Sequence, residues 1–284
     1  MDISFGLNSV TFGGIDCFDV DKSCSCGQAF RWRKKDAGQL GIVRGQPVLL
    51  EKSGDSVTVH GAGPDTAAMW AHYLDLGRDY ASIEKAVMED ERLAVCFPEA
   101  HGIRVFNQEP FEALISFIIS QNNNIKRISG IIERLSRLCG EPVDFMGETL
   151  YAFPTPERIA ALTEEELAAI GTGYRAPFIK SAAERILSGY ELEKLKDMSL
   201  TEARMELLTF YGIGPKVADC VLLFSLQHTD AFPIDVWIDR AMKALFFDGN
   251  AAKKAELYEA VSSLGEYSGI IQQYIFQYAR TKLR

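Results

Sequence analysis

The sequence predicts an α+β fold, in which an N-terminal antiparallel β-sheet with helices precedes a mostly α-helical domain that contains a helix-hairpin-helix motif. Short runs rich in Val, Thr, Phe and Gly fill residues 3–61. From about residue 64, apolar residues recur instead at intervals of three and four. Alternation with period two is typical of half-buried strands, and the longer spacing is typical of amphipathic helices.

The order of these patterns divides the chain into two predicted domains. Gln28–Arg33, Gly41–Arg44 and Ser56–His60 are expected as strands, and helical spacing begins at Thr66–Leu74 and Ile83–Met88. We expect an α+β domain over residues 1–104 and an all-helical domain over residues 105–284. The helices of the second domain are expected at Phe111–Leu138, Pro156–Ile170, Ala176–Ser188, Leu200–Phe210, Pro215–Leu226, Val236–Phe246, Ala251–Leu264 and Ile270–Leu283.

The composition is that of an ordinary globular protein, but the charge is unfavourable for a nucleic-acid partner. Of 284 residues, 47% are apolar and 24% are charged, and no window approaches the roughly 18 apolar residues of a membrane helix. The start lacks the basic and apolar regions of a signal peptide, so we expect a cytoplasmic protein with six free thiols. The net charge of −9 speaks against a polyanionic partner such as DNA.

The sequence of about residues 200–226 predicts a helix, a glycine turn and a second helix. Ser199 and Glu202 form a predicted capping box at its start. Gly212 and Gly214 allow a tight turn, and Pro215 suits the first position of the second helix. Free backbone N–H groups at that helix start can bind a phosphate, although such a turn is more often a plain connection.

Lys216 and Asp235 are the candidate catalytic pair. A cation in the first turn opposes the helix macrodipole, so the position of Lys216 suggests a function, namely a neutral amine that attacks a sugar carbon. Asp235 follows Pro233 and is placed to cap the next helix, where its carboxylate could stabilise a developing oxocarbenium ion. On the residues alone, a solvent-facing or phosphate-binding Lys216 and a purely structural Asp235 remain open.

Several motifs resemble one known family. Residues 211–220 (YGIGPKVADC) and 233–236 (PIDV) resemble the helix-hairpin-helix and Gly-Pro-Asp signature of base-excision DNA glycosylases, and more narrowly the 8-oxoguanine DNA glycosylase branch. Residues 26–32 (CGQAFRW), 117–125 (FIISQNNNI), 173–176 (GYRA) and 269–276 (GIIQQYIF) resemble further motifs of that branch. Together these ordered motifs cover most of the chain.

The resemblance implies a bifunctional glycosylase and lyase that flips the damaged base out of duplex DNA. Lys216 would attack the anomeric carbon, expel 8-oxoguanine and form a Schiff base, after which β-elimination cleaves the strand. Asp235 would stabilise the cationic transition state and help to orient the lysine.

The same resemblance implies a base pocket and DNA contacts. The Gly27 carbonyl would accept the ring N–H that oxidation creates, Phe276 and Cys220 would sandwich the base, and Gln272 would read its Watson–Crick edge. On residues alone, Phe276 and Cys220 are interpreted as core packing. The implied DNA-binding residues are Asn122, which would fill the vacated stack, Arg127 and Tyr174 near the estranged cytosine, and Gly212, Gly214 and Val217 of the hairpin. A helix end is the structural alternative for the Asn run at 122–124.

The expected partner is double-stranded DNA containing oxidised guanine, bound by a monomer. The resemblance implies no cofactor for the chemistry, while the uncharged hairpin leaves room for a structural monovalent cation. No cysteine follows Cys220, so we expect no iron–sulfur cluster, and the scattered histidines predict no metal site. Trp237 replaces a His that is common in eukaryotic relatives, and Phe224 replaces a Met, which together suggest a prokaryotic member.

Two alternatives remain, a non-catalytic helix-hairpin-helix DNA-binding protein and a glycosylase for a different damaged base. The first needs only the hairpin and leaves Asp235 and the Gly27 motif unexplained. The negative charge does not exclude DNA, because residues 51–95 and 141–170 carry nets of −5 and −6, whereas Arg104–Arg137 carries +2. We therefore expect a small electrostatic footprint and a shallow salt dependence of DNA binding.

Overall fold

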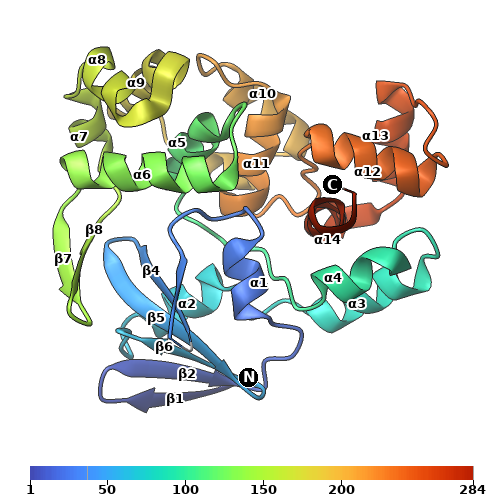
Figure 1. Cartoon of the computed structure of the whole chain (residues 1–284), viewed down its shortest axis with the longest axis horizontal. Helices are drawn as coiled ribbons and strands as arrows, with labels where there is room; N and C mark the ends of the chain where they lie inside the picture. Colours follow the sequence, from blue (N-terminus) through green and yellow to red (C-terminus); the bar gives the residue numbers. More distant parts are fainter. Residues whose placement is uncertain (37, 284) are drawn as a thin grey trace.

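The computed structural model describes residues 1–36 and 38–283, and it consists of a β-sheet at one end and a helical assembly at the other (Figure 1). The sheet has six antiparallel strands in the order β1-β2-β6-β5-β4-β3. Their bounds are β1 Asp2–Gly6, β2 Ser9–Gly13, β3 Arg33–Lys35, β4 Gly38–Val43, β5 Gln46–Ser53 and β6 Ser56–His60. This arrangement confirms the predicted fold class.

Alternation of apolar side chains places one face of the central strands in a core. Val10 and Leu50 both lie opposite Val59, from the two neighbours of β6, and all three are fully buried. This core also takes residues from α1 (Val20–Ser25) and α2 (Ala67–Tyr73), whose Trp70 is fully buried. The sheet therefore packs this face against helices, whereas its opposite face also buries Leu40, Ile42 and Leu49.

A second and larger core holds the helices together. It contains residues of α3 (Tyr80–Glu89), α4 (Phe97–Ala100) and most later helices. The later helices are α5 Pro110–Ser120, α6 Ile125–Cys139, α7 Pro156–Ala160, α8 Glu164–Leu167, α9 Ala176–Leu187, α10 Leu200–Leu208, α11 Pro215–Ser225, α12 Val236–Phe246, α13 Lys254–Ser262 and α14 Ser268–Lys282. Figure 1 shows α3 and α4 close to α14, so these two early helices pack with the late ones.

The expected single helical segment Phe111–Leu138 is wrong, because the chain breaks between α5 and α6. Asn122 has a left-handed φ of 47°, which a helix cannot accommodate. The Asn124 side chain then accepts a hydrogen bond from the Arg127 N–H at 3.0 Å and caps α6. The Asn run is thus a helix end and a helix start joined by a turn.

Two other expectations need correction. The second domain is not all-helical, because β7 (Pro142–Phe145) and β8 (Glu148–Tyr151) form a separate antiparallel hairpin after α6. The expected strand Gln28–Arg33 is also wrong, since only Arg33 belongs to β3. The Gln28 carbonyl accepts from Gln108 Nε2, and its side chain bonds to backbone groups of residues far along the chain, so the segment forms no ladder there.

The helix-hairpin-helix motif is confirmed at α10 and α11. The Ser199–Glu202 capping box is present at the start of α10. Gly212 has a φ of 79°, and a Cβ at this position would lie 2.3 Å from the Phe178 ring, so the turn requires glycine. Pro215 begins α11 as expected. Within the described ranges, no helix has the length and apolar character to cross a membrane.

Candidate active site

The candidate catalytic residues line one cavity of about 670 Å³ at the meeting of five segments. These are the Gly27 loop, the turn between α5 and α6, the hairpin before α11, the start of α12 and the last turns of α14. Its lining residues are Gly27, Phe30, Phe117, Ser120, Gln121, Asn122, Asn123, Asn124, Ile125, Lys126, Ile128, Gly214, Pro215, Lys216, Val217, Ile234, Asp235, Val236, Trp237, Phe276 and Arg280. Segments far apart in the sequence therefore build one cavity that is large enough for a base and its sugar.

Lys216 reaches into the cavity from the second position of α11. Its Nζ donates to Ser120 Oγ at 3.2 Å and lies 5.5 Å from the centre of the Phe117 ring. No ion pair joins Lys216 to any residue that the structure describes. Burial raises the pKa of the adjacent Cys220 thiol to about 11, although the Lys216 charge opposes that shift. Burial thus favours the protonated form of the Cys220 thiol.

Asp235 caps α12 as predicted. Its Oδ1 accepts from the backbone N–H groups of Trp237 and Ile238, at 2.9 Å each. No described residue donates to Oδ2, so this oxygen keeps its full acceptor capacity beside the cavity. A carboxylate held in this way at a helix start is a fixed negative charge facing the space where a sugar cation would form.

Gly27 lies in the cavity wall, and the buried residue after it holds it in place. Its φ is 91°, and a Cβ there would lie 2.9 Å from Ile125 and 3.4 Å from Phe276. Gln28 is completely buried, and its Nε2 donates to the carbonyls of Ser23 and Arg104 at 2.9 and 2.7 Å. Its Oε1 accepts from the Phe106 N–H at 2.7 Å. The chain before and after Gly27 is thus rigidly anchored.

The other predicted base-pocket residues divide into two groups. Phe276 lines the cavity, whereas Cys220 and Gln272 lie behind its wall and are 3% and 4% exposed. Gln272 Nε2 donates to the Pro233 carbonyl at 2.9 Å, two residues before Asp235. In this state Gln272 therefore ties α14 to the segment that carries Asp235.

Of the predicted DNA-contact residues Asn122, Arg127 and Tyr174, one lines the cavity. Asn122 lines the cavity, and its Nδ2 donates to the Tyr174 hydroxyl at 3.1 Å. Tyr174 and Arg127 are exposed and lie outside the cavity wall.

Sequence reasoning did not single out Arg175, which is 3% exposed and donates to the carbonyls of Gln121, Asn122 and Thr172. The one sequence feature that could have pointed to Arg175 is its position in the motif GYRA at residues 173–176.

The hairpin offers backbone donors rather than charge. Gly214 and Val217 line the cavity, whereas Gly212 lies outside it and fixes the turn. Gly214 is the N-cap of α11 and has no side chain with which to satisfy the first N–H groups of that helix. Within the described part of the chain, the backbone N–H groups of residues 216 and 217 have no acceptor outside the helix, which is the usual arrangement at a helix start.

Comparisons with known proteins agree with this geometry. Residues 14–114 match the model of the 8-oxoguanine DNA glycosylase N-terminal domain, and residues 115–266 match that of the HhH-GPD superfamily base excision DNA repair proteins. The chain belongs to this superfamily of base excision repair proteins, and to its 8-oxoguanine glycosylase branch.

Individual relatives fall in the same branch of the HhH-GPD superfamily. The chain is 33% identical to a probable N-glycosylase/DNA lyase of Methanothermobacter thermautotrophicus, over 68% of each chain. It is 34% identical to N-glycosylase/DNA lyase OGG1 of Arabidopsis thaliana, over 88% of this chain and 74% of the relative. The structure of the Clostridium acetobutylicum 8-oxoguanine glycosylase/lyase, with double-stranded DNA containing cytosine opposite 8-oxoguanine, superposes with a TM-score of 0.96 at 34% identity, covering 100% of this chain and 99% of the other.

Trp237 and Phe224, the two residues that depart from the pattern of the relatives, differ in whether they line the cavity. Trp237 lines the cavity, and the Arg240 guanidinium lies 5.3 Å from the centre of its ring. Phe224 is 2% exposed and stacks on Phe117 at 5.3 Å, so it acts on the cavity only through that ring. Trp237 therefore forms part of the cavity surface, and Phe224 packs behind the Phe117 ring that forms part of that surface.

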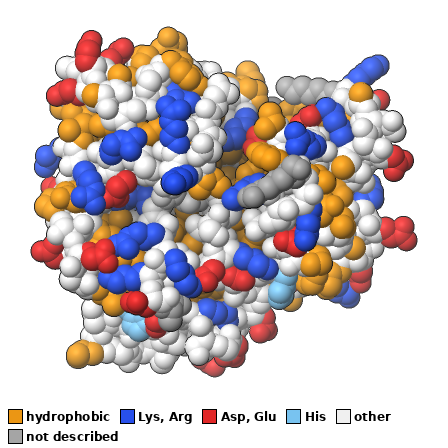
Figure 2. All heavy atoms as spheres, in the orientation of Figure 1, with side chains coloured by type: hydrophobic (Ala, Val, Ile, Leu, Met, Phe, Trp, Pro, Cys, Tyr) orange, Lys and Arg blue, Asp and Glu red, His pale blue; other side chains and the backbone are white. Residues whose placement is uncertain are grey.

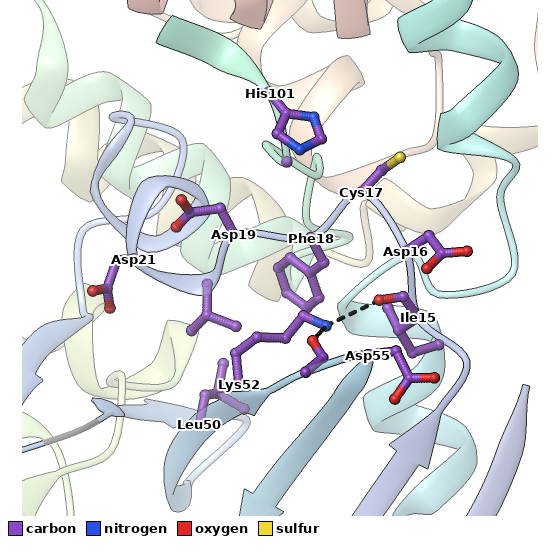
Figure 3. Close-up of a pocket in the computed structure, with 13 residues that line it drawn as sticks. Ile15, Asp16, Cys17, Phe18, Asp19, Asp21, Leu50, Lys52, Asp55 and His101 are labelled. Carbon is purple, nitrogen blue, oxygen red and sulfur yellow. Dashed lines mark hydrogen bonds between the residues drawn. The ribbon is translucent and has the colours of Figure 1, made fainter. Parts of the chain in front are cut away.

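A second cavity, of about 540 Å³, lies beside the sheet and away from the Lys216 cavity (Figure 3). Figure 3 shows Lys52 among Asp16, Asp19 and Asp55, with its amine bonded to the Ile15 carbonyl at 3.0 Å. The two cavities share no lining residue. Among the described residues, no group of three or more His, Cys, Asp or Glu side chains could hold a metal ion.

Charges of both signs are interspersed over the face of the molecule seen in Figure 2. Several acidic side chains of the protein form ion pairs, and one example is Glu148, whose carboxylate lies 2.5 Å from Lys35 Nζ. The net charge of −9 therefore does not produce a uniformly acidic surface on this face.

Proposed function

We propose that this protein is a bifunctional DNA glycosylase and lyase that removes 8-oxoguanine from duplex DNA during base excision repair. The observation that carries the proposal is the convergence of Lys216 and Asp235 on one cavity, each presented by the start of a helix. A DNA-binding module would need the hairpin but not a cavity with a lysine and a carboxylate in its walls. The names of the relatives support the same activity.

Lys216 acts as the nucleophile. Its neutral amine attacks C1′ of the flipped nucleotide, the bond from C1′ to N9 breaks, and the electron pair of that bond leaves with the base. Loss of an amine proton and opening of the sugar ring give a Schiff base. Removal of a C2′ proton then expels the 3′ phosphate by β-elimination, and water finally releases the enzyme. The lysine thereby links base release to strand cleavage.

Asp235 acts through its fixed charge. As the C1′–N9 bond lengthens, positive charge builds on the sugar, and the free Oδ2 lies in the cavity wall to stabilise it. Because Oδ1 already holds two backbone N–H groups, the carboxylate needs no reorganisation during the reaction.

Recognition of the base involves Gly27, Phe276, Cys220 and Gln272. The Gly27 carbonyl accepts the N7–H that only the oxidised base carries, and normal guanine leaves this carbonyl unsatisfied, at a cost of about 1–3 kcal/mol. Phe276 provides a face for the base, with Cys220 on the other side. Gln272 reads the Watson–Crick edge after it gives up the Pro233 carbonyl that it holds in this state.

The DNA is held at the cavity mouth and by the hairpin. Asn122 fills the vacated stack, Arg127 and Tyr174 approach the estranged base, and backbone groups of Gly212, Gly214 and Val217 hold a phosphate. The complex of the Clostridium relative with 8-oxoguanine duplex supports such an arrangement.

We also propose a monomeric, cytoplasmic enzyme of prokaryotic type, divided into domains at about residue 104.

A structural monovalent cation at the hairpin belongs to the same proposal. Residues 211–215 carry no charged side chain, so a cation held by backbone carbonyls would add positive potential toward the phosphate. We expect damaged-duplex affinity to fall when potassium is replaced by tetramethylammonium at equal ionic strength. Equal affinities in the two salts would contradict a cation at this place.

The test is a cleavage panel in which several lesions are each placed opposite all four bases. We expect 8-oxoguanine to be released with strand scission, and undamaged guanine to be left intact. Release of an alkylated base without strand scission would instead assign a monofunctional glycosylase. Binding without release of any base would assign a non-catalytic module.

A further inference from the structure

The partner of the Lys216 amine is a serine from another helix. Ser120 is the last residue of α5, it lines the same cavity, and its Oγ lies 3.2 Å from Lys216 Nζ. The helices α5 and α11 pack against each other, so the contact depends on the core and not on a mobile loop. No sequence motif connects the two residues, which are 96 positions apart.

This contact accounts for a lysine at a helix position where a cation is disfavoured. The first turn of α11 is the positive end of its own helix dipole. The side chain of Lys216, however, carries Nζ away from that start to Ser120, the last residue of α5.

The direction of the hydrogen bonds determines how the amine is turned. Ser120 has one hydroxyl proton, and it donates this proton to the Phe117 carbonyl at 2.7 Å. Its Oγ can therefore only accept from Lys216, and the amine must point an N–H at the serine. The lone pair of the neutral amine consequently points away from Ser120. The Phe117 ring lies on another side, 5.5 Å from Nζ, and the Cys220 thiol also forms a side-chain hydrogen bond with Lys216. The cavity lies on the side of the amine that these groups do not occupy.

Asp235 does not supply this orientation. It forms no ion pair with Lys216, and its Oδ1 is engaged by two backbone N–H groups of α12. Lys126 lines the same cavity but is exposed, and no described residue accepts a hydrogen bond from its amine. Of the two cavity lysines, Lys216 is the one whose amine an acceptor holds.

We propose that Ser120 is a positioning residue that holds the Lys216 amine with its lone pair toward the substrate carbon. The inference rests on the proposed function, in which Lys216 is the nucleophile. Through Ser120, helix α5 would then contribute to Schiff-base formation as well as to the hydrophobic core.

The test uses a duplex that already contains an abasic site, so that base recognition and release do not contribute. Borohydride trapping is followed in single turnover at saturating enzyme, and DNA affinity is measured separately. We expect Ser120→Ala to slow trapping about ten-fold, the effect of one aligned hydrogen bond, with unchanged DNA affinity. Ser120→Thr keeps the hydroxyl and its bond to the Phe117 carbonyl, and is expected to restore the rate.

Ser116→Ala is the matched control. Ser116 lies one turn earlier on α5, is also buried, at 4% exposure against 9% for Ser120, and does not line the cavity, so its loss should leave trapping unchanged. The inference is overturned if Ser120→Ala traps at the rate of the unaltered protein, if Ser120→Thr is as slow as Ser120→Ala, or if Ser116→Ala is equally slow. Failure of the unaltered protein to trap any DNA would instead overturn the proposed function itself.

Discussion

Lys216 and Asp235 line the same cavity, yet they do not pair with each other. Lys216 Nζ bonds to Ser120, and Asp235 Oδ1 bonds to the backbone of α12. The two side chains are thus held by separate partners on different helices. In the proposed function, this separation lets each group meet the substrate without first breaking a contact with the other.

Asp235→Asn tests the charge without removing the helix cap. Asparagine is as good an N-cap as aspartate, so the fold and DNA affinity should change little. We expect base release to slow about 100- to 1,000-fold, the range for loss of one preorganised electrostatic group. Single-turnover release of 8-oxoguanine measures this. Asp235→Ala should lose about 1 kcal/mol of stability as well, and equal release rates for Asp235→Asn and the unaltered protein would refute the role of the charge.

Gly27→Ala tests the cavity wall. The new methyl group would lie 2.9 Å from Ile125 and 3.4 Å from Phe276, on a backbone with a φ of 91°. We expect 8-oxoguanine release to fall by more than about ten-fold, because the carbonyl and the base face must shift. Cleavage of a preformed abasic site should fall much less. A parallel loss of both activities would mean that the substitution disrupts more than base recognition.

Arg175→Lys tests the support of the Asn122 turn. The arginine fork donates to three backbone carbonyls, and a lysine amine cannot reproduce this planar geometry. We expect a loss of stability of about 2 kcal/mol and weaker binding of damaged duplex. Thermal unfolding and binding assays measure the two effects. Unchanged binding by a folded Arg175→Lys variant would show that the turn needs no such support.

Glu112→Gln tests a buried carboxyl on α5. Burial raises the pKa of Glu112 to about 7, against the opposing effect of Arg31, whose Nη1 lies 3.6 Å away, and with a further contribution from Glu109. The folded state favours the protonated acid, so its stabilising contribution is complete below the unfolded pKa of 4.5 and is lost as pH rises through about 7. Glutamine removes this dependence.

The melting temperature of Glu112→Gln should therefore rise relative to that of the unaltered protein between pH 5 and pH 8, where up to about 1.4 kcal/mol per pH unit is at stake. Thermal unfolding at several pH values measures the difference. A constant offset between the two proteins across this range would contradict the account of Glu112.

Local signals predicted the parts of the site that depend on neighbouring residues. The capping box at Ser199, the glycine turn and Pro215 are properties of one short segment, and all are present as predicted. The cap at Asp235 is equally local. The break at Asn122 was ambiguous, because apolar residues with helical spacing continue on both sides of it.

Contacts between distant segments could not be predicted in this way. Ser120 meets Lys216 only because α5 packs on α11, and Gln28 anchors Gly27 through groups 76 to 80 residues away. The hairpin of β7 and β8 was missed because its strands have only four residues each and are not deeply buried. Spacing rules detect burial periodicity, which such short exposed strands barely show.

The most direct test of the central claim, that Lys216 is the nucleophile, is borohydride trapping with an 8-oxoguanine duplex. Lys126→Gln is the matched control, since Lys126 lines the same cavity and its loss removes the same charge. We predict a covalent complex for the unaltered protein and for Lys126→Gln, and none for Lys216→Gln. A covalent complex formed by Lys216→Gln would contradict the account.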